Sequence, residues 1–368
     1  MDLTTILVAL GLLTGLLGAD AALNANTVGV RFYVPQPVEE TGISREVAEQ
    51  IFTNEILKIN RTPSLLAPPQ VRSTSDPSVL GVIANTLKLQ DITYALQSAL
   101  GLSPLRLNGA VILVRGNQRL VVTGSSPDFG PFTVDVREGE DITDLLRSAA
   151  FGSIEQVQPY RAALHRFVQT VESGGADFSA VRTIAERELA RPARPQSRDQ
   201  RGFLQNLLGV VALMNRDLAE AEDRFNQALA IRPDLDVGRL NLAFVRAQQD
   251  RYEEALALLR PVVELRLVPP QPPVLAAAQI TWAVAAWAMG DTAEGERRFA
   301  EALRADGGGA AVAYEHWAKL LEEAGRPEAA AEKRALARAH QPTFENYPEV
   351  ALLYFQLSSR DNQPLRRR

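Results

Sequence analysis

Residues that resemble catalytic motifs occur in this chain without the partners that their chemistry requires. Asp128-Phe129-Gly130 has the order of a kinase magnesium-binding motif, but no Gly-rich phosphate loop and no kinase catalytic loop accompany it. Gly307-Gly308-Gly309 follows an expected helix and lacks a neighbouring Lys-Ser or Lys-Thr pair, so it predicts a hinge and not a phosphate cradle. No Gly-x-Ser-x-Gly nucleophile motif is present. These motifs therefore predict neither phosphoryl transfer nor hydrolysis.

Side chains that bind metals or act as nucleophiles are scarce. The chain has no cysteine, which excludes thiol catalysis, disulfides and Cys-ligated metal sites. Its three histidines, His165, His316 and His340, lie in segments with helical patterns, where packing or surface roles are favoured. Adjacent carboxylates such as Glu253 and Glu254 point apart on a helix. We expect no catalytic residues, no metal and no cofactor, and a protein that is not an enzyme.

Composition limits the classes of partner. The 368 residues are 46% hydrophobic, which is enough to bury more than one core and argues against wholesale disorder. The formal net charge is −5, whereas a general nucleic-acid binder needs a basic stripe to displace counterions. We therefore expect a folded chain of more than one domain whose partners do not include nucleic acid.

The first 26 residues form an apolar segment with three possible roles. Residues 3–18 carry no charge, and Ala19-Asp20-Ala21 has the small-x-small spacing of a signal-peptide cleavage site, although no basic residue precedes the apolar run. A single-pass membrane helix is the preferred interpretation, and a buried helix is the third. Arg31 follows the segment and favours a body on the cytoplasmic side of the cell membrane.

Residues 27–153 predict a small α+β domain. Ser44 and Asp141 are expected N-caps of two helices, and Val47 is expected to open the apolar stripe of the first. An antiparallel sheet with helices on one face is the natural packing for these elements. The order is strand, helix, strand, helix, three strands and helix, with expected ranges 27–34, 45–59, 82–89, 92–100, 105–114, 119–123, 132–136 and 142 onward to Pro159.

The second half of the chain repeats. Leu208-Gly209 recurs as Leu242-Ala243, and Ala221 recurs as Ala255, at the same interval. The best unit, residues 207–234, adds Phe225 and a closing proline, and it resembles the tetratricopeptide repeat (TPR) family. Further units carry small and large residues in the same register, after a six-residue shift at residues 268–274, and they include Trp282, Ala283, Gly295, Phe299, Ala302, Trp317, Ala318, Ala330 and Ala337.

The resemblance implies a solenoid of helical hairpins. Each hairpin buries its apolar face only by stacking on its neighbours. Residues 198–345 are assigned to the repeats, 154–197 to a degenerate hairpin and linker, and 346–368 to a capping helix and basic tail. The fold class is thus an N-terminal apolar helix, a small α+β domain and an all-α TPR superhelix. This order also resembles bacterial TPR proteins with a membrane-proximal α+β domain, which implies anchoring.

The first helix of each TPR hairpin lines a concave surface, so alignment of the units identifies expected groove residues. The groove is expected to be largely apolar and to bind a protein or peptide segment through aromatic anchors. For Phe244 and Trp287 the alternative is that both rings fill the core of the superhelix. Two alternatives remain: a periplasmic or secreted assembly factor after signal cleavage, and a ligand-sensing or enzymatic α+β domain. The expected groove residues are Asn206, Val210, Asn241, Phe244, Ile280, Val284, Trp287, His316 and Lys319.

Overall fold

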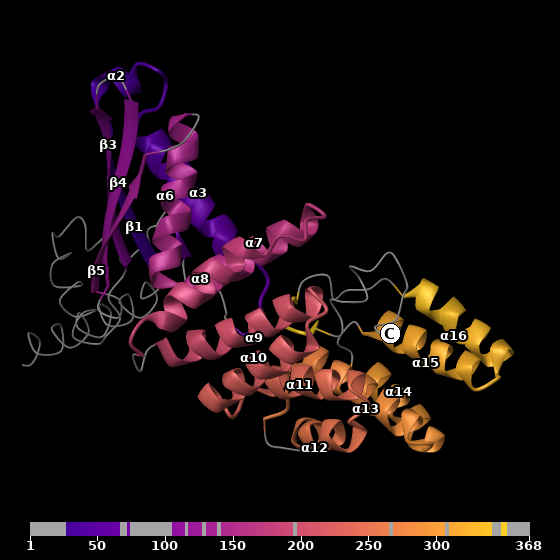
Figure 1. The fold of residues 1–368 in the computed structure, drawn as a ribbon. Coiled ribbons are helices and arrows are strands. Elements are labelled where there is room, and N and C mark those ends of the chain that lie inside the picture. The colour runs from indigo at the N-terminus through magenta and orange to yellow at the C-terminus, as the bar shows by residue number, and fades with distance from the viewer. Residues whose placement is uncertain are drawn as a thin grey trace, which may run out of the picture. The chain divides into compact units, whose positions relative to one another are not determined.

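The protein is mostly helical, with a small sheet near its N-terminus (Figure 1). Two compact units can be distinguished: residues 1–62 with 69–162, called the sheet unit, and residues 63–68 with 163–368, called the repeat unit. The computed structural model describes residues 27–66, 72–73, 105–114, 117–126, 130–137, 141–193, 197–264, 268–305, 309–340 and 347–351.

The sheet unit contains a mixed sheet with the strand order β2-β1-β3-β4-β5 in the described residues. The antiparallel expectation holds for β3–β4 and β4–β5, but it is wrong for β1, which runs parallel to both neighbours. A parallel pair requires a long crossover, and the chain between β1 and β3 is long enough to contain one. The strands are β1 (Thr27–Tyr33), β2 (Arg72–Ser73), β3 (Leu105–Val114), β4 (Asn117–Ser126) and β5 (Gly130–Val136).

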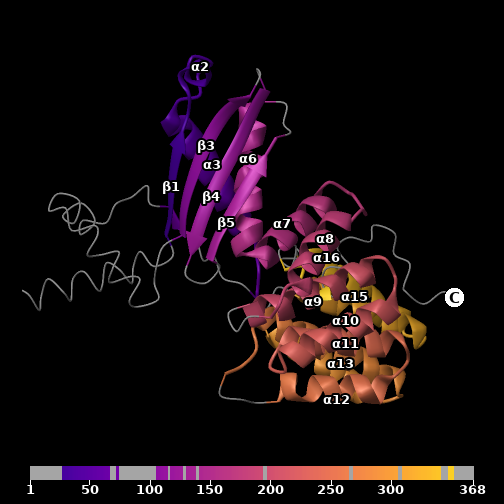
Figure 2. The same ribbon diagram turned by 60° about the vertical axis from the view of Figure 1, so that its left-hand side comes forward.

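Two helices, α3 (Arg45–Asn60) and α6 (Ile142–Val157), cover one face of this sheet (Figure 2). Both predicted N-caps are confirmed. The Ser44 hydroxyl accepts a hydrogen bond from the Val47 amide, and the Asp141 carboxylate accepts one from the Asp144 amide. A short helix, α2 (Gln36–Glu39), precedes α3.

The predicted apolar stripe of α3 is corrected by the structure. Val47 is 36% exposed, whereas Ala48, Phe52 and Ile56 are buried at i, i+4 spacing. Phe52 packs edge-on against Phe32 of β1, with ring centroids 5.1 Å apart. The buried stripe therefore begins one residue later than expected, at Ala48, whereas Ile56 and Ile59 are buried as the pattern predicted.

Other expectations fall outside the described residues or are contradicted. The expected strand at 82–89 and the helix at 92–100 are not described. Across the part of the chain that is described, no helix is long and apolar enough to cross a bilayer. That finding contradicts the expected single-pass localisation. Residues 1–26, to which the span was assigned, are not described, and membrane attachment plays no part in the function proposed below.

The repeat unit is built from helical hairpins. The helices α7 (Pro159–Glu172) and α8 (Ser179–Ala190) precede the paired helices α9–α16, and α7 crosses the boundary between the units. Contacts pair α9 with α10, α11 with α12, α13 with α14 and α15 with α16, and α13 also contacts α11 and α15. The first helices of the last three hairpins are thus neighbours. The bounds are α9 (Arg198–Met214), α10 (Leu218–Ile231), α11 (Asp236–Gln248), α12 (Tyr252–Val263), α13 (Pro272–Ala288), α14 (Thr292–Arg304), α15 (Ala310–Glu323) and α16 (Pro327–Ala339).

The turn inside each of these hairpins contains a residue with positive φ. The residues are Arg216, Asp250, Gly290 and Gly325. The interval between Asp250 and Gly290 is six residues longer than the interval between Arg216 and Asp250, as the shift near residue 270 predicted. A left-handed residue at equivalent positions marks the same tight turn in each hairpin.

Helices α9 and α10 approach closely at Gly209. A Cβ atom added there would lie 2.4 Å from the ring of Phe225, which is fully buried. We expect Gly209→Ala to destabilise the repeat unit by about 1–3 kcal/mol in urea unfolding, because overpacking outweighs the gain in helix propensity. Gly238→Ala is the matched control, since its nearest neighbour atoms are flexible leucine ends at 3.2–3.4 Å. Equal effects in the two variants would contradict this account.

Candidate functional site

Two of the predicted groove residues, Asn206 of α9 and Asn241 of α11, contact each other and form the centre of the candidate site. The Asn241 Nδ2 atom donates to Asn206 Oδ1 at 2.9 Å. Both side chains are fully buried. We call these two residues the asparagine pair. Because the pair joins the first helices of two successive hairpins, its position depends on how those hairpins stack.

The asparagine pair binds main-chain atoms of the chain's own residues Tyr347–Ala351, which we call the cis segment. Asn241 Nδ2 donates to the Glu349 carbonyl at 2.8 Å, and Asn206 Nδ2 donates to the same oxygen at 3.4 Å. The Ala351 amide donates to Asn241 Oδ1 at 3.1 Å. One side-chain amide thus acts as donor and acceptor toward two peptide groups of the same segment.

The cis segment is a turn. The Val350 amide donates to the Tyr347 carbonyl at 3.1 Å, and Pro348 occupies the second position of the turn, where its fixed φ is favourable. Glu349, Val350 and Ala351 are fully buried. The capping helix expected within residues 346–368 is therefore wrong for residues 347–350, which form a turn. The residues after Ala351 are not described.

A second segment of the repeat unit, residues 63–66, binds the side chain of Glu349. The Ser64 hydroxyl donates to Glu349 Oε1 at 2.5 Å, and the Leu65 amide donates to the same oxygen at 3.2 Å. Gln271, the N-cap of α13, donates from Nε2 to the Leu65 carbonyl at 2.8 Å. A buried carboxylate is thereby hydrogen-bonded to groups fixed by the repeats, as a buried charge requires.

Sequence reasoning did not identify Ser64, Leu65, Gln271 or Glu349. Glu349 falls in the expected capping helix, and residues 63–66 fall in no expected helix or strand. Contacts between positions more than 280 residues apart leave no local pattern. Pro348 is a local signal of the turn, because proline is favoured at the second position of β-turns.

Three of the five apolar residues among the predicted groove positions are buried in this structure, and two are half-buried. Val210 and Ile280 are fully buried and Phe244 is 6% exposed, whereas Val284 is half-buried. Trp287 packs against the buried cluster of Ala318, Leu321 and Ala330 and is also half-buried. Trp287 therefore contacts the next hairpin, as expected of a residue that fixes the spacing of repeats.

His316 and Lys319 lie on α15, away from the asparagine pair in sequence. His316 is half-buried and Lys319 is exposed. Desolvation, followed by the nearby charge of Lys319, lowers the pKa of His316 to about 4. Protonation of this imidazole is therefore disfavoured by the fold.

The lowered pKa of His316 predicts a pH dependence of stability. Between pH 4 and 6.5 the unfolded chain binds this proton more readily than the folded one, so stability falls as the pH is lowered through that range. From pH 7 to pH 5 we expect His316 to contribute a loss of about 2 kcal/mol. Urea unfolding of His316→Gln should lack this component, and the same loss in both proteins would contradict the assignment.

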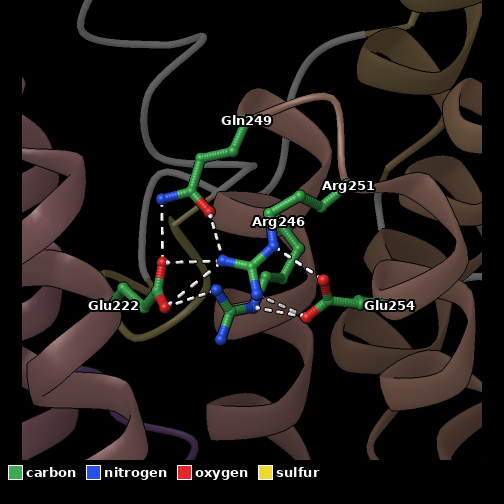
Figure 3. Close-up of polar contacts among 5 residues, drawn as sticks. All are labelled: Glu222, Arg246, Gln249, Arg251 and Glu254. Carbon is green, nitrogen blue, oxygen red and sulfur yellow. Dashed lines mark hydrogen bonds and ion pairs between the residues drawn. The ribbon is translucent and has the colours of Figure 1, made fainter.

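A charged network connects α10, α11 and α12 (Figure 3). Glu222 of α10 accepts hydrogen bonds from Arg246 and from Gln249, the latter at 2.8 Å. Arg251 joins Glu222 to Glu254, and its guanidinium lowers the pKa of the Glu254 carboxyl. Two arginines and two glutamates balance in charge, and the contacts cross from one hairpin to the next. We interpret the network as a set of ion pairs and hydrogen bonds that stabilises the packing of one hairpin against the next.

The residues considered for catalysis do not form a common site. His165 is buried in α7, and His340 at the end of α16 lies against Tyr314, with ring centroids 5.4 Å apart. Asp128 and Phe129 are not described, and Gly309 is the N-cap of α15. Among the described residues, no cluster of three or more His, Asp or Glu side chains has the arrangement of a metal site.

Stacked antiparallel hairpins whose first helices adjoin define a helical-repeat protein. A family model described as a tetratricopeptide repeat matches residues 212–267, which include the end of α9 and all of α10, α11 and α12. The chain therefore carries TPR repeats, as its sequence predicted. A comparison with curated proteins found no match. The matched residues include Asn241, and Asn206 lies in the same helix as the start of the match.

Proposed function

We propose that the repeat unit is a protein-interaction module that holds a short turn of a partner protein by its main chain, through the asparagine pair. The observation that carries this proposal is the double contact of Asn241, which donates to one peptide group of the cis segment and accepts from another. A carboxamide matches a peptide group in both donor and acceptor, so it selects main-chain geometry. The asparagine pair, which binds a turn of its own chain in this way, can make the same hydrogen bonds to a similar turn of a partner protein.

The family supports an interaction role, since TPR modules typically act by binding and stacked hairpins present an extended concave surface. In this proposal the buried side chains of Val210 and Ile280 pack between helices and do not contact the partner. Trp287 keeps successive hairpins at their spacing. No catalytic step is part of the proposal.

The test is a selection from a displayed library of random peptides on the full chain. Because the cis segment occupies the asparagine pair, the selection uses Ala351→Pro, which removes the amide that Asn241 accepts from. We expect peptides that bind this variant and bind at least 10-fold more weakly when Asn206→Ala and Asn241→Ala are added. Peptides that bind equally well with and without the pair would refute the proposed site.

A further inference from the structure

We infer that the cis segment is a built-in competitor of the partner, and that the partner presents a similar turn: a proline, then an acidic residue, then small apolar residues. This inference rests on the proposed function and names both the chemistry of the partner and the control of access. It follows from what each part of the cis segment contacts.

The main-chain contacts fix the position of the turn and do not depend on which side chains it carries. The carbonyl of Glu349 and the amide of Ala351 are the atoms that the asparagine pair binds. Any chain with the same turn offers these two groups in the same geometry. A proline before the acidic residue preorganises the turn and reduces the entropy lost on binding.

The side-chain contacts supply selectivity. The Glu349 carboxylate is fully buried and accepts from the Ser64 hydroxyl and the Leu65 amide. The Leu66 amide in turn donates to the Ser64 hydroxyl oxygen at 3.2 Å, which holds this acceptor site in shape. A partner without a carboxyl group at this place leaves the Leu65 amide without its acceptor. An unsatisfied hydrogen-bonding group in a buried site is costly, so the site selects an acidic residue at this position.

The residues after the acid must be small and apolar. Val350 and Ala351 are completely excluded from solvent. A charged or long polar residue at either place would be desolvated without a partner. The recognised sequence is thus of the type Pro-Glu-Val-Ala, which the chain itself carries at 348–351.

Covalent attachment makes the cis segment a strong competitor. A tethered ligand acts at an effective concentration in the millimolar range, so it occupies the site even when its intrinsic affinity is modest. The apparent affinity of a partner is then reduced by the fraction of molecules in which the site is open. Partner binding is expected to displace the turn and to release residues 63–66 from Glu349.

The experiment measures fluorescence anisotropy of a labelled peptide of residues 345–353 with the full chain. We expect the peptide to bind Ala351→Pro at least 10-fold more tightly than the wild-type chain. We also expect a peptide with lysine at the position of Glu349 to bind Ala351→Pro at least 10-fold more weakly than the unchanged peptide. Ser64→Ala in the Ala351→Pro background should weaken the unchanged peptide and leave the lysine peptide unaffected. Val350→Asp is a second opened variant, for use if Ala351→Pro does not fold by circular dichroism.

The outcomes separate this inference from the proposed function. Equal binding of the peptide to wild-type and opened chains would refute the built-in competitor and leave the asparagine site standing. Failure of the peptide to bind, with library peptides still dependent on the asparagine pair, would refute the partner chemistry alone. Failure of both the peptide and the library would refute the proposed function together with the inference.

Discussion

Arg161→Met is expected to lower the free energy of unfolding of the sheet unit by about 2–5 kcal/mol, because two buried carbonyls lose their donor and each such loss costs about 1–3 kcal/mol. The Arg161 side chain is 3% exposed, and its Nη1 atom donates to the carbonyls of Asn60 and Thr62, at 2.9 and 2.5 Å. These carbonyls lie at the C-terminal end of α3, where helices leave carbonyl groups unsatisfied and favour cations. Methionine fills a similar volume but cannot donate.

The readout is hydrogen exchange of amides in β3 and β4, because the three tryptophans, Trp282, Trp287 and Trp317, all belong to the repeat unit. The matched control is Arg147→Met on α6 of the same unit, whose side chain is exposed and should change stability by less than about 0.5 kcal/mol. Wild-type exchange rates in Arg161→Met would show that the two carbonyls do not depend on this guanidinium.

Asn241→Leu is expected to release the cis segment from the repeats. Leucine resembles asparagine in size but removes the 2.8 Å donor of the Glu349 carbonyl, which keeps only the 3.4 Å contact from Asn206, and it removes the acceptor of the Ala351 amide. Each such group costs about 1–3 kcal/mol if it stays buried, so the segment is more stable in water than in the site. The Ala351 amide should exchange about 100-fold faster or more, which corresponds to a local loss of roughly 3 kcal/mol.

The control for this variant is Asn226→Leu on α10, where the asparagine is exposed. It should leave exchange at Ala351 unchanged, and both variants should keep their helical circular dichroism. If Ala351 stayed protected in Asn241→Leu, the segment would be held by apolar burial of Val350 and Ala351, and the asparagine pair would not be its anchor.

The repeat architecture was predictable because its signal is local and recurrent. Gly209 and Ala221 indicate where two helices touch, and the close approach of Phe225 to Gly209 is the contact that these residue types imply. The N-caps Ser44 and Asp141 were equally readable, since each binds an amide three residues later. The parallel pairing of β1 could not be predicted from the sequence, because it depends on a crossover and not on the residue pattern of the strand itself.

The sequence predicts only part of the candidate site. The repeat alignment placed Asn206 and Asn241 in first helices, but their 35-residue separation does not match the repeat interval from Leu208 to Leu242, so a strict alignment does not pair them. Their ligand came from a remote part of the chain. The Glu349 contacts with Ser64 and Leu65 depend on tertiary structure throughout, and no periodicity in the sequence encodes them.

The most direct test of main-chain recognition is titration calorimetry of Ala351→Pro protein with peptides of residues 345–353 in which one amide is replaced by an ester. An ester at the position of Ala351 removes the N–H that Asn241 accepts from, and an ester at Tyr347 leaves that contact intact. We predict at least 10-fold weaker binding for the first ester and unchanged binding for the second. Equal affinity of the two ester peptides would contradict recognition of the turn by its main chain.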